Sequence, residues 1–280
     1  MSPGLDDKHR RLEAILRGMG SCAIGFSGGV DSTLLLAVAV SVLGERALAV
    51  TAVSATYPEW ERREAEELAR RIGARHRLIV SQELDLPGFA ANPPNRCYLC
   101  KSELFAKLRQ VAAEEGLEHV ADGANVDDGR DYRPGRQATR EQGVRSPLDE
   151  AGLGKDEIRQ LSRALGLPTW DKPALACLSS RFPYGTPITR AKLLQLERAE
   201  TALRQLGLRQ LRVRHHGDVA RLEVAAEDIE QVAGALRGAV VRALREAGFA
   251  YVALDLEGYR TGAMNEVILT RPQGSSEDGP

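Results

Sequence analysis

The chain has 280 residues, a formal net charge of −1 and 43% hydrophobic residues, so it can fold as one large domain or two modest ones without disulfide staples. Its 38 Lys and Arg residues nearly balance its 39 Asp and Glu residues, which gives no general reason to expect nucleic acid or an anionic membrane as a partner. No apolar run approaches the ~20 residues that span a bilayer, and the N-terminus MSPGLDDKHRR lacks the apolar core of a secretion signal, so we expect a cytoplasmic protein.

Strand and helix patterns alternate along the first half of the chain. Short apolar runs predict buried strands at residues 22–26, 47–53, 76–80 and 118–122. Helices are predicted between them at residues 32–44, 58–73 and 97–116, and Pro58 and Gly73 stand where a helix starts and stops. This alternation favours an α/β fold with a parallel sheet covered on both faces, which binds ligands at the carboxyl ends of its strands.

Two irregular segments interrupt this alternation. Residues 122–148 are polar and turn-rich, residues 167–189 are irregular and contain proline, and a helix is predicted between them at 155–166. Such segments are too long to be idle connectors in a compact domain. We therefore expect them to form the rim of an active site.

A second, smaller unit is predicted after these segments. Thr189 is placed to cap a helix at 190–207, and residues 210–225 read as two strands joined by a turn at His216 and Gly217. One amphipathic helix at 227–248 and a strand at 251–259 complete a small α+β domain. We expect a first domain at 1–186, a second at 187–270 and a disordered tail at 271–280.

A phosphate loop is predicted between the first strand and the first helix, in the segment SGGVDS at residues 27–32. Gly28 and Gly29 let backbone N–H groups approach an anion, the helix N-terminus adds its positive dipole, and Ser27 and Ser32 carry hydroxyl donors. The alternative is a tight strand-to-helix turn with a serine cap. The lysine of the Walker loop is missing from the segment.

Four cysteines stand at Cys22, Cys97, Cys100 and Cys177. Cys97 and Cys100 form a Cys-x-x-Cys pair at a helix start, which is typical of zinc or iron–sulfur ligands, and the helix N-terminus favours thiolate. A dithiol redox pair, half of a structural zinc site and incidental spacing remain alternatives. Cys177 is the nearest further candidate ligand, and Cys22 is expected in the core.

Acidic and amide side chains follow the predicted strands. Asp31, in the phosphate loop, is placed to help hold Mg²⁺, which prefers one or two carboxylates together with substrate phosphates. Asp122, Asn125 and Asp128 follow the strand at 118–122, so we expect them near the phosphates of the ligand and Mg²⁺, although Asp and Asn are also ordinary turn formers.

The segment SGGVDS resembles the pyrophosphate-loop (PP-loop) signature of ATPases that cleave ATP between the α and β phosphates. Together with the segments DGANVDD, RCYLCK, KPALACLSSRFPYG and LRVRHHGDVARLEV, which span most of the chain, it resembles the LarE family of ATP-dependent sulfur transferases. That resemblance implies adenylation of a pyridinium dicarboxylate mononucleotide and replacement of AMP by sulfur, on the way to a nickel-pincer nucleotide. It also implies an adenine nucleotide α hydrolase-like domain, a small second domain and a homo-oligomer, either a dimer or a hexamer.

The resemblance also implies how sulfur is delivered and where the substrate phosphate binds. Some members sacrifice the sulfur of the cysteine that matches Cys177, whereas others hold a [4Fe-4S] cluster on three cysteines that match Cys97, Cys100 and Cys177. Three thiolates leave one iron open for a sulfide or another sulfur donor, and we favour the cluster. The substrate phosphate is expected at Ser180, Arg181, Arg212 and Arg214, where arginine suits phosphate.

Three other functions remain open from the sequence. A tRNA thiolase would share the loop and three cysteines, but the near-neutral charge and the lack of an obvious RNA-binding extension argue against nucleic acid as a partner. A zinc- or redox-regulated nucleotide-binding protein would bind ATP without releasing pyrophosphate. An amide-forming synthetase would need a source of ammonia, and no glutaminase region is evident.

Overall fold

The computed structural model describes residues 3–130, 135–174, 176–260 and 262–263. Two compact units make up the chain, unit 1 at Met1–Cys177 and unit 2 at Leu178–Pro280. The boundary predicted from the sequence lies further along the chain, between residues 186 and 187. The tail at 271–280, for which disorder is expected, lies outside the described residues.

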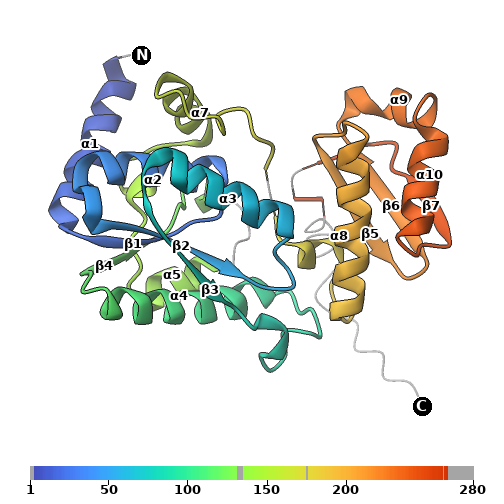
Figure 1. Ribbon diagram of the computed structural model, residues 1–280, viewed down its shortest axis with the longest axis horizontal. Coiled ribbons are helices and arrows are strands. Elements are labelled where there is room, and N and C mark those ends of the chain that lie inside the picture. Colours follow the sequence, from blue (N-terminus) through green and yellow to red (C-terminus); the bar gives the residue numbers. More distant parts are fainter. Residues whose placement is uncertain (1–2, 131–134, 175, 261, 264–280) are drawn as a thin grey trace. The chain divides into compact units, whose positions relative to one another are not determined.

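A four-stranded parallel sheet lies at the centre of unit 1, in the order β3-β2-β1-β4 (Figure 1). Its strands are β1 (Cys22–Gly25), β2 (Ala47–Val53), β3 (Arg75–Val80) and β4 (His119–Ala121). All four coincide with predicted strands to within a few residues. Because β1 pairs in parallel with both β2 and β4, the segments that follow β1 and β4 emerge at the same edge of the sheet.

Helices cover both faces of this sheet (Figure 1). One face is covered by α1 (Pro3–Met19), α2 (Val30–Leu43), α3 (Glu59–Ile72) and α7 (Lys155–Ala164), the other by α4 (Arg96–Glu114) and α5 (Gly135–Glu141). Side chains alternate between the two cores, with Cys22 and Ile24 facing α2 and Ala23 facing α4. This is the predicted α/β fold, a parallel sheet covered by helices on both faces.

Two helical regions of unit 1 depart from the sequence expectations. The N-terminal helix α1 was not predicted, although it buries an apolar stripe at near-helical spacing, namely Leu5, Leu12, Leu16 and Met19. Within the turn-rich segment 122–148, residues 135–141 form α5, and Pro147–Glu150 form the single turn α6. Tertiary packing explains α5, because its Ala138 is buried in the same core as Phe105 and Leu108 of α4.

Unit 2 is a small α+β unit built on a three-stranded sheet in the order β5-β6-β7. Its main elements are α8 (Arg190–Gln205), β5 (Leu211–His216), β6 (Val219–Val224), α9 (Ile229–Ala233), α10 (Arg237–Glu246) and β7 (Tyr251–Leu254). Strands β5 and β6 are antiparallel and β6 and β7 are parallel. Thr189 caps α8 as predicted, since its side-chain oxygen accepts a hydrogen bond from the Lys192 amide at 3.3 Å.

Two predictions in unit 2 are wrong in detail. The single helix predicted at 227–248 is interrupted at Gly234, whose backbone (φ −103°, ψ −97°) is not helical. The strand predicted at 251–259 ends at Leu254, and a turn follows that brings Gly258 against β6 with φ +69°. A Cβ at Gly258 would lie 2.8 Å from the Val224 carbonyl oxygen, so only glycine fits this close approach. Within the described ranges, no helix is both long and apolar enough to cross a membrane.

Candidate active site

The segment Ser27–Ser32 spans the turn after β1 and the first turn of α2, and Gly29 is the residue that caps α2. Gly28 has φ +66°, and a Cβ there would lie 3.3 Å from both the Cα and the Cβ of Ala65 in α3. Two constraints therefore require glycine at this position, the left-handed backbone and the close approach of α3. The loop presents backbone N–H groups at the start of a helix, which is a favourable place for an anion.

The polar groups of the loop are held by long hydrogen bonds. The hydroxyl oxygens of Ser27 and Ser32 lie 3.2 Å apart, and the Ser27 hydroxyl oxygen accepts a bond from the Gly29 amide at 3.4 Å. Bonds of this length are at the weak end of the normal range, so a phosphate can compete for these donors. The Tyr57 hydroxyl donates to the Ser27 carbonyl at 3.0 Å. Burial, with the charges of Glu61 and Glu64, raises the pKa of Tyr57, which therefore stays a donor.

Asp31 and the residues after β4 lie together at the carboxyl edge of the sheet. The Asp31 carboxylate pairs with Lys155 Nζ at 2.6 Å and accepts a bond from Asn125 Nδ2 at 3.4 Å. The Asp128 carboxylate accepts a hydrogen bond from the backbone N–H of Asn125 at 3.0 Å. Asp122 is buried and accepts bonds from the Ser146 hydroxyl at 2.7 Å, the Ala124 amide at 3.1 Å and the Lys101 ammonium at 3.3 Å.

Lysines that the sequence analysis did not single out contribute positive charge here. Lys172 Nζ donates to the Gly28 carbonyl at 2.8 Å and pairs with Glu64 Oε2 at 2.9 Å. Lys155 stands at the first position of α7. Lys172 lies in the segment KPALACLSSRFPYG. No local pattern indicates its pairing, because the Lys172–Gly28 contact joins residues 144 positions apart.

Cys97 and Cys177 both contribute to the electrostatics of Cys100, whereas Cys22 lies in the core. Cys97 and Cys100 lie in the first two turns of α4, Cys97 exposed and Cys100 half-buried, and Cys177 is half-buried. Burial raises the pKa of the Cys100 thiol, and the charges of Cys177, Glu83 and Cys97 raise it further. Cys97 and Cys177 are therefore near enough to Cys100 to interact electrostatically.

A buried arginine lies beside the first of these thiols. Arg96 Nη2 lies 3.9 Å from Cys97 Sγ, and its Nη1 donates to the side-chain oxygen of Asn92, which has φ +56°. Among the residues that the structure describes, no group of three or more His, Cys, Asp or Glu side chains is arranged to hold a metal ion. Cys22 is buried in the core as expected, and burial raises its pKa to about 12.

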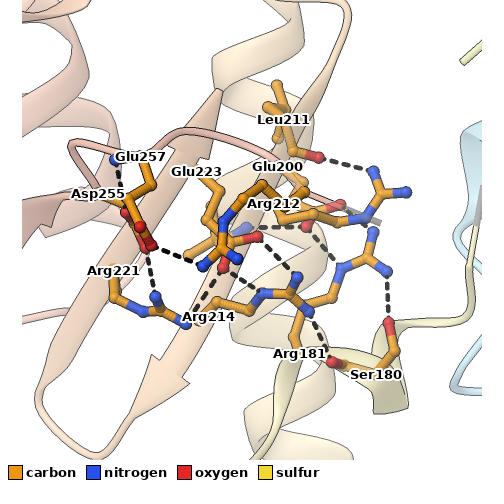
Figure 2. A network of polar contacts seen from close by, with 12 residues as sticks. Ser180, Arg181, Glu200, Leu211, Arg212, Arg214, Arg221, Glu223, Asp255 and Glu257 are labelled. Atoms are coloured by element: carbon orange, nitrogen blue, oxygen red, sulfur yellow. Dashed lines mark hydrogen bonds and ion pairs between the residues drawn. The ribbon is translucent and has the colours of Figure 1, made fainter. Parts of the chain in front are cut away.

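Unit 2 contains a network of buried arginines and carboxylates around Arg181 (Figure 2). Arg181 is 1% exposed and binds both oxygens of Glu200, from Nε at 2.8 Å and from Nη2 at 2.9 Å. Its Nη1 donates to the Ser180 hydroxyl at 2.9 Å. Burial raises the pKa of Glu200, but the charge and hydrogen bonds of Arg181 outweigh burial and hold it below its usual value.

Arg214 is held in the same manner by Glu223 of β6. The two Arg214–Glu223 bonds measure 2.9 and 2.6 Å, and Arg214 Nη1 donates to the Ser180 carbonyl at 2.9 Å. Arg221 lies 3.1 Å from Glu223 and also pairs with Asp255, so the network extends toward β7 (Figure 2). Ser180, Arg181 and Arg214, three of the four predicted substrate-phosphate residues, are thus in direct contact.

Arg212, the fourth of these residues, is also buried. Its Nη1 donates to the Leu211 carbonyl at 2.7 Å, and its guanidinium carbon lies 5.0 Å from the centre of the Tyr259 ring. Burial, and next the charge of Arg181, lowers the pKa of Arg212 to about 10. Arg212 therefore belongs electrostatically to the same cluster. The two carboxylates at its centre, Glu200 and Glu223, are each 1% exposed.

Comparison with known proteins extends these observations. Residues 12–91, which include β1, the loop, α2 and α3, match the asparagine synthase family. The chain is 39% identical over 265 residues to the pyridinium-3,5-bisthiocarboxylic acid mononucleotide synthase of Lactiplantibacillus plantarum, covering 94% of this chain and 96% of that protein. It is 48% identical over 265 residues to an uncharacterized protein of Synechocystis, covering 94% and 99%.

A more distant relative matches only part of the chain. The argininosuccinate synthase of Haloarcula marismortui is 26% identical over 162 residues, which is 54% of this chain and 38% of that protein. The match to the Lactiplantibacillus synthase, by contrast, covers 94% of this chain and therefore includes both units. The chain therefore belongs to the LarE family of the PP-loop ATP pyrophosphatases and is an ATP-dependent, adenylating sulfur transferase.

Proposed function

We propose that this enzyme adenylates a carboxylate of pyridinium-3,5-biscarboxylic acid mononucleotide and converts it to a thiocarboxylate, a step in making the nickel-pincer nucleotide. The observation that carries the proposal is the 39% identity to the Lactiplantibacillus synthase over 94% of the chain. A carboxylate oxygen attacks the α-phosphorus of ATP and pyrophosphate leaves. Sulfur then attacks the acyl carbon and AMP leaves, since AMP is a far better leaving group than hydroxide.

The phosphate loop is the proposed ATP site. Ser27, Gly28, Gly29 and Ser32 offer amide and hydroxyl donors to the leaving pyrophosphate. Asp31 would hold Mg²⁺ together with phosphate oxygens, and the contact of Asn125 with Asp31 supports this assignment. Asp122 and Asp128 would act one step further away, since they accept hydrogen bonds from the backbone amides of Ala124 and Asn125 and so hold the segment that carries Asn125.

The arginine network of unit 2 is the proposed site for the substrate phosphate. Ser180, Arg181, Arg212 and Arg214 bring three guanidinium groups and a hydroxyl into one cluster, while Glu200 and Glu223 fix two of the guanidinium groups. Arginine binds phosphate through its planar fork of donors. A cluster of guanidinium groups favours an anionic ligand such as a mononucleotide over a neutral one.

A [4Fe-4S] cluster on Cys97, Cys100 and Cys177 is the proposed route for sulfur. The donor chemistry supports the group: thiolates are the usual ligands of iron–sulfur clusters, Cys97 and Cys100 lie in the first two turns of α4, and buried Arg96, whose Nη2 lies 3.9 Å from Cys97 Sγ, can offset negative charge. Such a cluster would supply an iron that no cysteine ligates, to which a sulfide or other sulfur donor can bind. The alternative is sacrifice of the Cys177 sulfur in a single turnover.

Anaerobic purification followed by iron and sulfide analysis tests the sulfur route. We expect iron in the wild-type protein and in Cys22→Ala, whose cysteine is buried in the core, and loss of iron in Cys97→Ala and Cys100→Ala. The mass of the protein after turnover separates the two routes. An iron-free protein that loses one H₂S from Cys177 would overturn the cluster while leaving sulfur transfer intact.

Substrate and assembly are tested separately. We expect the pyridinium mononucleotide to stimulate pyrophosphate release and tRNA not to do so, whereas strong stimulation by tRNA would overturn the proposed substrate. We also propose that the chain forms a homo-oligomer, a dimer or a hexamer. Light scattering coupled to size exclusion would measure the mass, and a monomer at micromolar concentration would contradict this proposal.

A further inference from the structure

The phosphate loop carries no cation of its own, although its ligand is strongly anionic. The segment Ser27–Ser32 has Val30 and Asp31 between its glycines and its second serine. In the Walker loop a lysine within the motif reaches the β and γ phosphates. A loop without that lysine must receive positive charge from another segment if it is to stabilise departing pyrophosphate.

Lys172 already reaches the loop from a distant segment. Its ammonium lies 2.8 Å from the Gly28 carbonyl oxygen, and its side chain is only 11% exposed. A buried ammonium normally has strong hydrogen-bonding partners. Its carboxylate partner, Glu64 at 2.9 Å, is 41% exposed, so the pair is worth little by itself and can be exchanged for another anion.

The segment around Lys172 is fixed in place by α7. Arg159 of α7 donates to the Trp170 carbonyl at 2.7 Å and to the Lys172 carbonyl at 2.8 Å. The Lys172 amide donates to the Thr169 carbonyl at 3.0 Å. The backbone that carries the ammonium is thus held on both sides of its side chain.

The loop is equally constrained where Lys172 meets it. Gly28 has a left-handed backbone and lies against Ala65 of α3, and Glu64 is the neighbour of Ala65. Three elements therefore converge on one point, the loop, α3 and the segment at 168–174. From this arrangement we propose that Lys172 supplies the missing cation, binding the β and γ phosphates of ATP and then the leaving pyrophosphate.

This proposal rests on the adenylating activity and adds a residue to it. The competing explanation is that Lys172 only ties α3 to the loop. A purely structural contact would affect the affinity of the loop for every ligand equally, and it would be lost when Glu64 is changed. A phosphate-binding lysine matters for pyrophosphate and not for AMP, and it does not need Glu64.

The test compares full-length variants by calorimetric titration with Mg²⁺-pyrophosphate and with AMP. Lys172→Met should weaken pyrophosphate binding by about 10- to 100-fold, the range of a hydrogen bond to a charged group, while AMP binding is unchanged. Lys172→Arg should restore most of the affinity, and Glu64→Gln should bind pyrophosphate at least as tightly as wild type. Lys192→Met is the matched control, because Lys192 donates to the Pro187 carbonyl at 3.0 Å in unit 2.

The outcomes separate the two explanations and the underlying activity. Unchanged pyrophosphate affinity in Lys172→Met would overturn the proposal, as would an equal loss of AMP affinity or the same loss in Glu64→Gln. Exchange of labelled pyrophosphate into ATP by the wild type, measured in parallel with the pyridinium mononucleotide, tests the adenylation step. Its absence would count against the proposed function, whereas the pyrophosphate titrations would still decide the role of Lys172.

Discussion

The two units hold positive charge in different ways. In unit 1, Lys155 pairs with Asp31 and Lys172 pairs with Glu64, and both carboxylates are partly exposed to solvent. Lys172 also donates a hydrogen bond to the backbone carbonyl of Gly28. In unit 2, Arg181 and Arg214 each bind both oxygens of a carboxylate that is 1% exposed. A solvent-exposed ion pair can be exchanged for contacts to a ligand at little cost in free energy. Separating a buried ion pair is strongly unfavourable, because it leaves an unpaired charge in the protein interior.

This contrast predicts that changes in the two units have different readouts. Changes to the cations of unit 1 should alter ligand binding and leave the fold nearly intact. Changes to the arginines of unit 2 should alter the stability of unit 2 first. Both tryptophans, Trp60 and Trp170, lie in unit 1, so tryptophan fluorescence follows unit 1 alone while far-ultraviolet circular dichroism follows both units.

The largest effect is expected for Arg181→Met. The change leaves Glu200 buried without its main partner, and breaking one side of a buried ion pair costs about 3–5 kcal/mol. We expect unit 2 to unfold at lower denaturant than unit 1, so that dichroism and fluorescence no longer report one transition. Arg10→Met is the control, since the exposed Arg10–Asp7 pair (69% and 72% exposed) should contribute nothing measurable. If the unfolding transition of unit 2 is unchanged in Arg181→Met, the proposed difference between the two units is wrong.

A smaller effect is expected for Gly28→Ala. Forcing an alanine into the left-handed region costs about 1–2 kcal/mol, and the new Cβ would also press on Ala65 at 3.3 Å. Gly73→Ala is matched, because Gly73 has a left-handed backbone (φ +75°, ψ +25°) and nothing within 4 Å of its Cβ position. Denaturant unfolding followed by tryptophan fluorescence should show a larger loss for Gly28→Ala. Equal losses would mean that α3 does not constrain the loop.

The pH dependence of unit 2 should report the Glu200 pair. The pKa of Glu200 is lowered in the folded state, so the unfolded chain takes up this proton first as the pH falls. The pair's contribution is therefore complete above the unfolded pKa of about 4.3 and is lost below it, with a slope of up to about 1.4 kcal/mol per pH unit. We expect the free energy of unfolding, measured by circular dichroism in denaturant between pH 7 and pH 3, to fall less steeply with decreasing pH in Glu200→Gln than in wild type. An identical pH dependence would rule out Glu200 as its source.

The sequence allowed the α/β fold and the phosphate loop to be anticipated, because each depends on local pattern or on a motif. The convergence of Cys97, Cys100 and Cys177 stays a prediction. Strand alternation also put Arg212 and Arg214 on one face of β5. It could not give their partners, since Glu223 lies opposite Arg212 in the β5–β6 register yet binds Arg214. That choice depends on side-chain geometry after the sheet has formed.

Long-range contacts explain what the sequence could not predict in unit 1. Lys172 meets Gly28 across 144 positions, and Lys155 meets Asp31 across 124. Neither spacing has a periodicity, so only the packing of α7 and its neighbouring segment against the loop brings these charges together. The helix α1 is a different case, because its apolar residues Leu5, Leu12, Leu16 and Met19 recur at near-helical spacing in the sequence and by themselves indicate an amphipathic helix.

The smallest effect on stability is expected for Lys155→Met, and it is the most informative for the loop. The Lys155 and Asp31 side chains are 34% and 24% exposed, so the free energy of unfolding should change by less than about 1 kcal/mol. Lys155 occupies the carboxylate that would bind Mg²⁺, so removing it should lower the Mg²⁺ concentration needed for half-maximal pyrophosphate exchange. Lys8→Met is the control, because Lys8 forms a similar 2.6 Å pair with Glu157 on the same helix. If Lys155→Met requires more Mg²⁺ than wild type, Lys155 assists the phosphates directly and the loop draws its cations from both lysines.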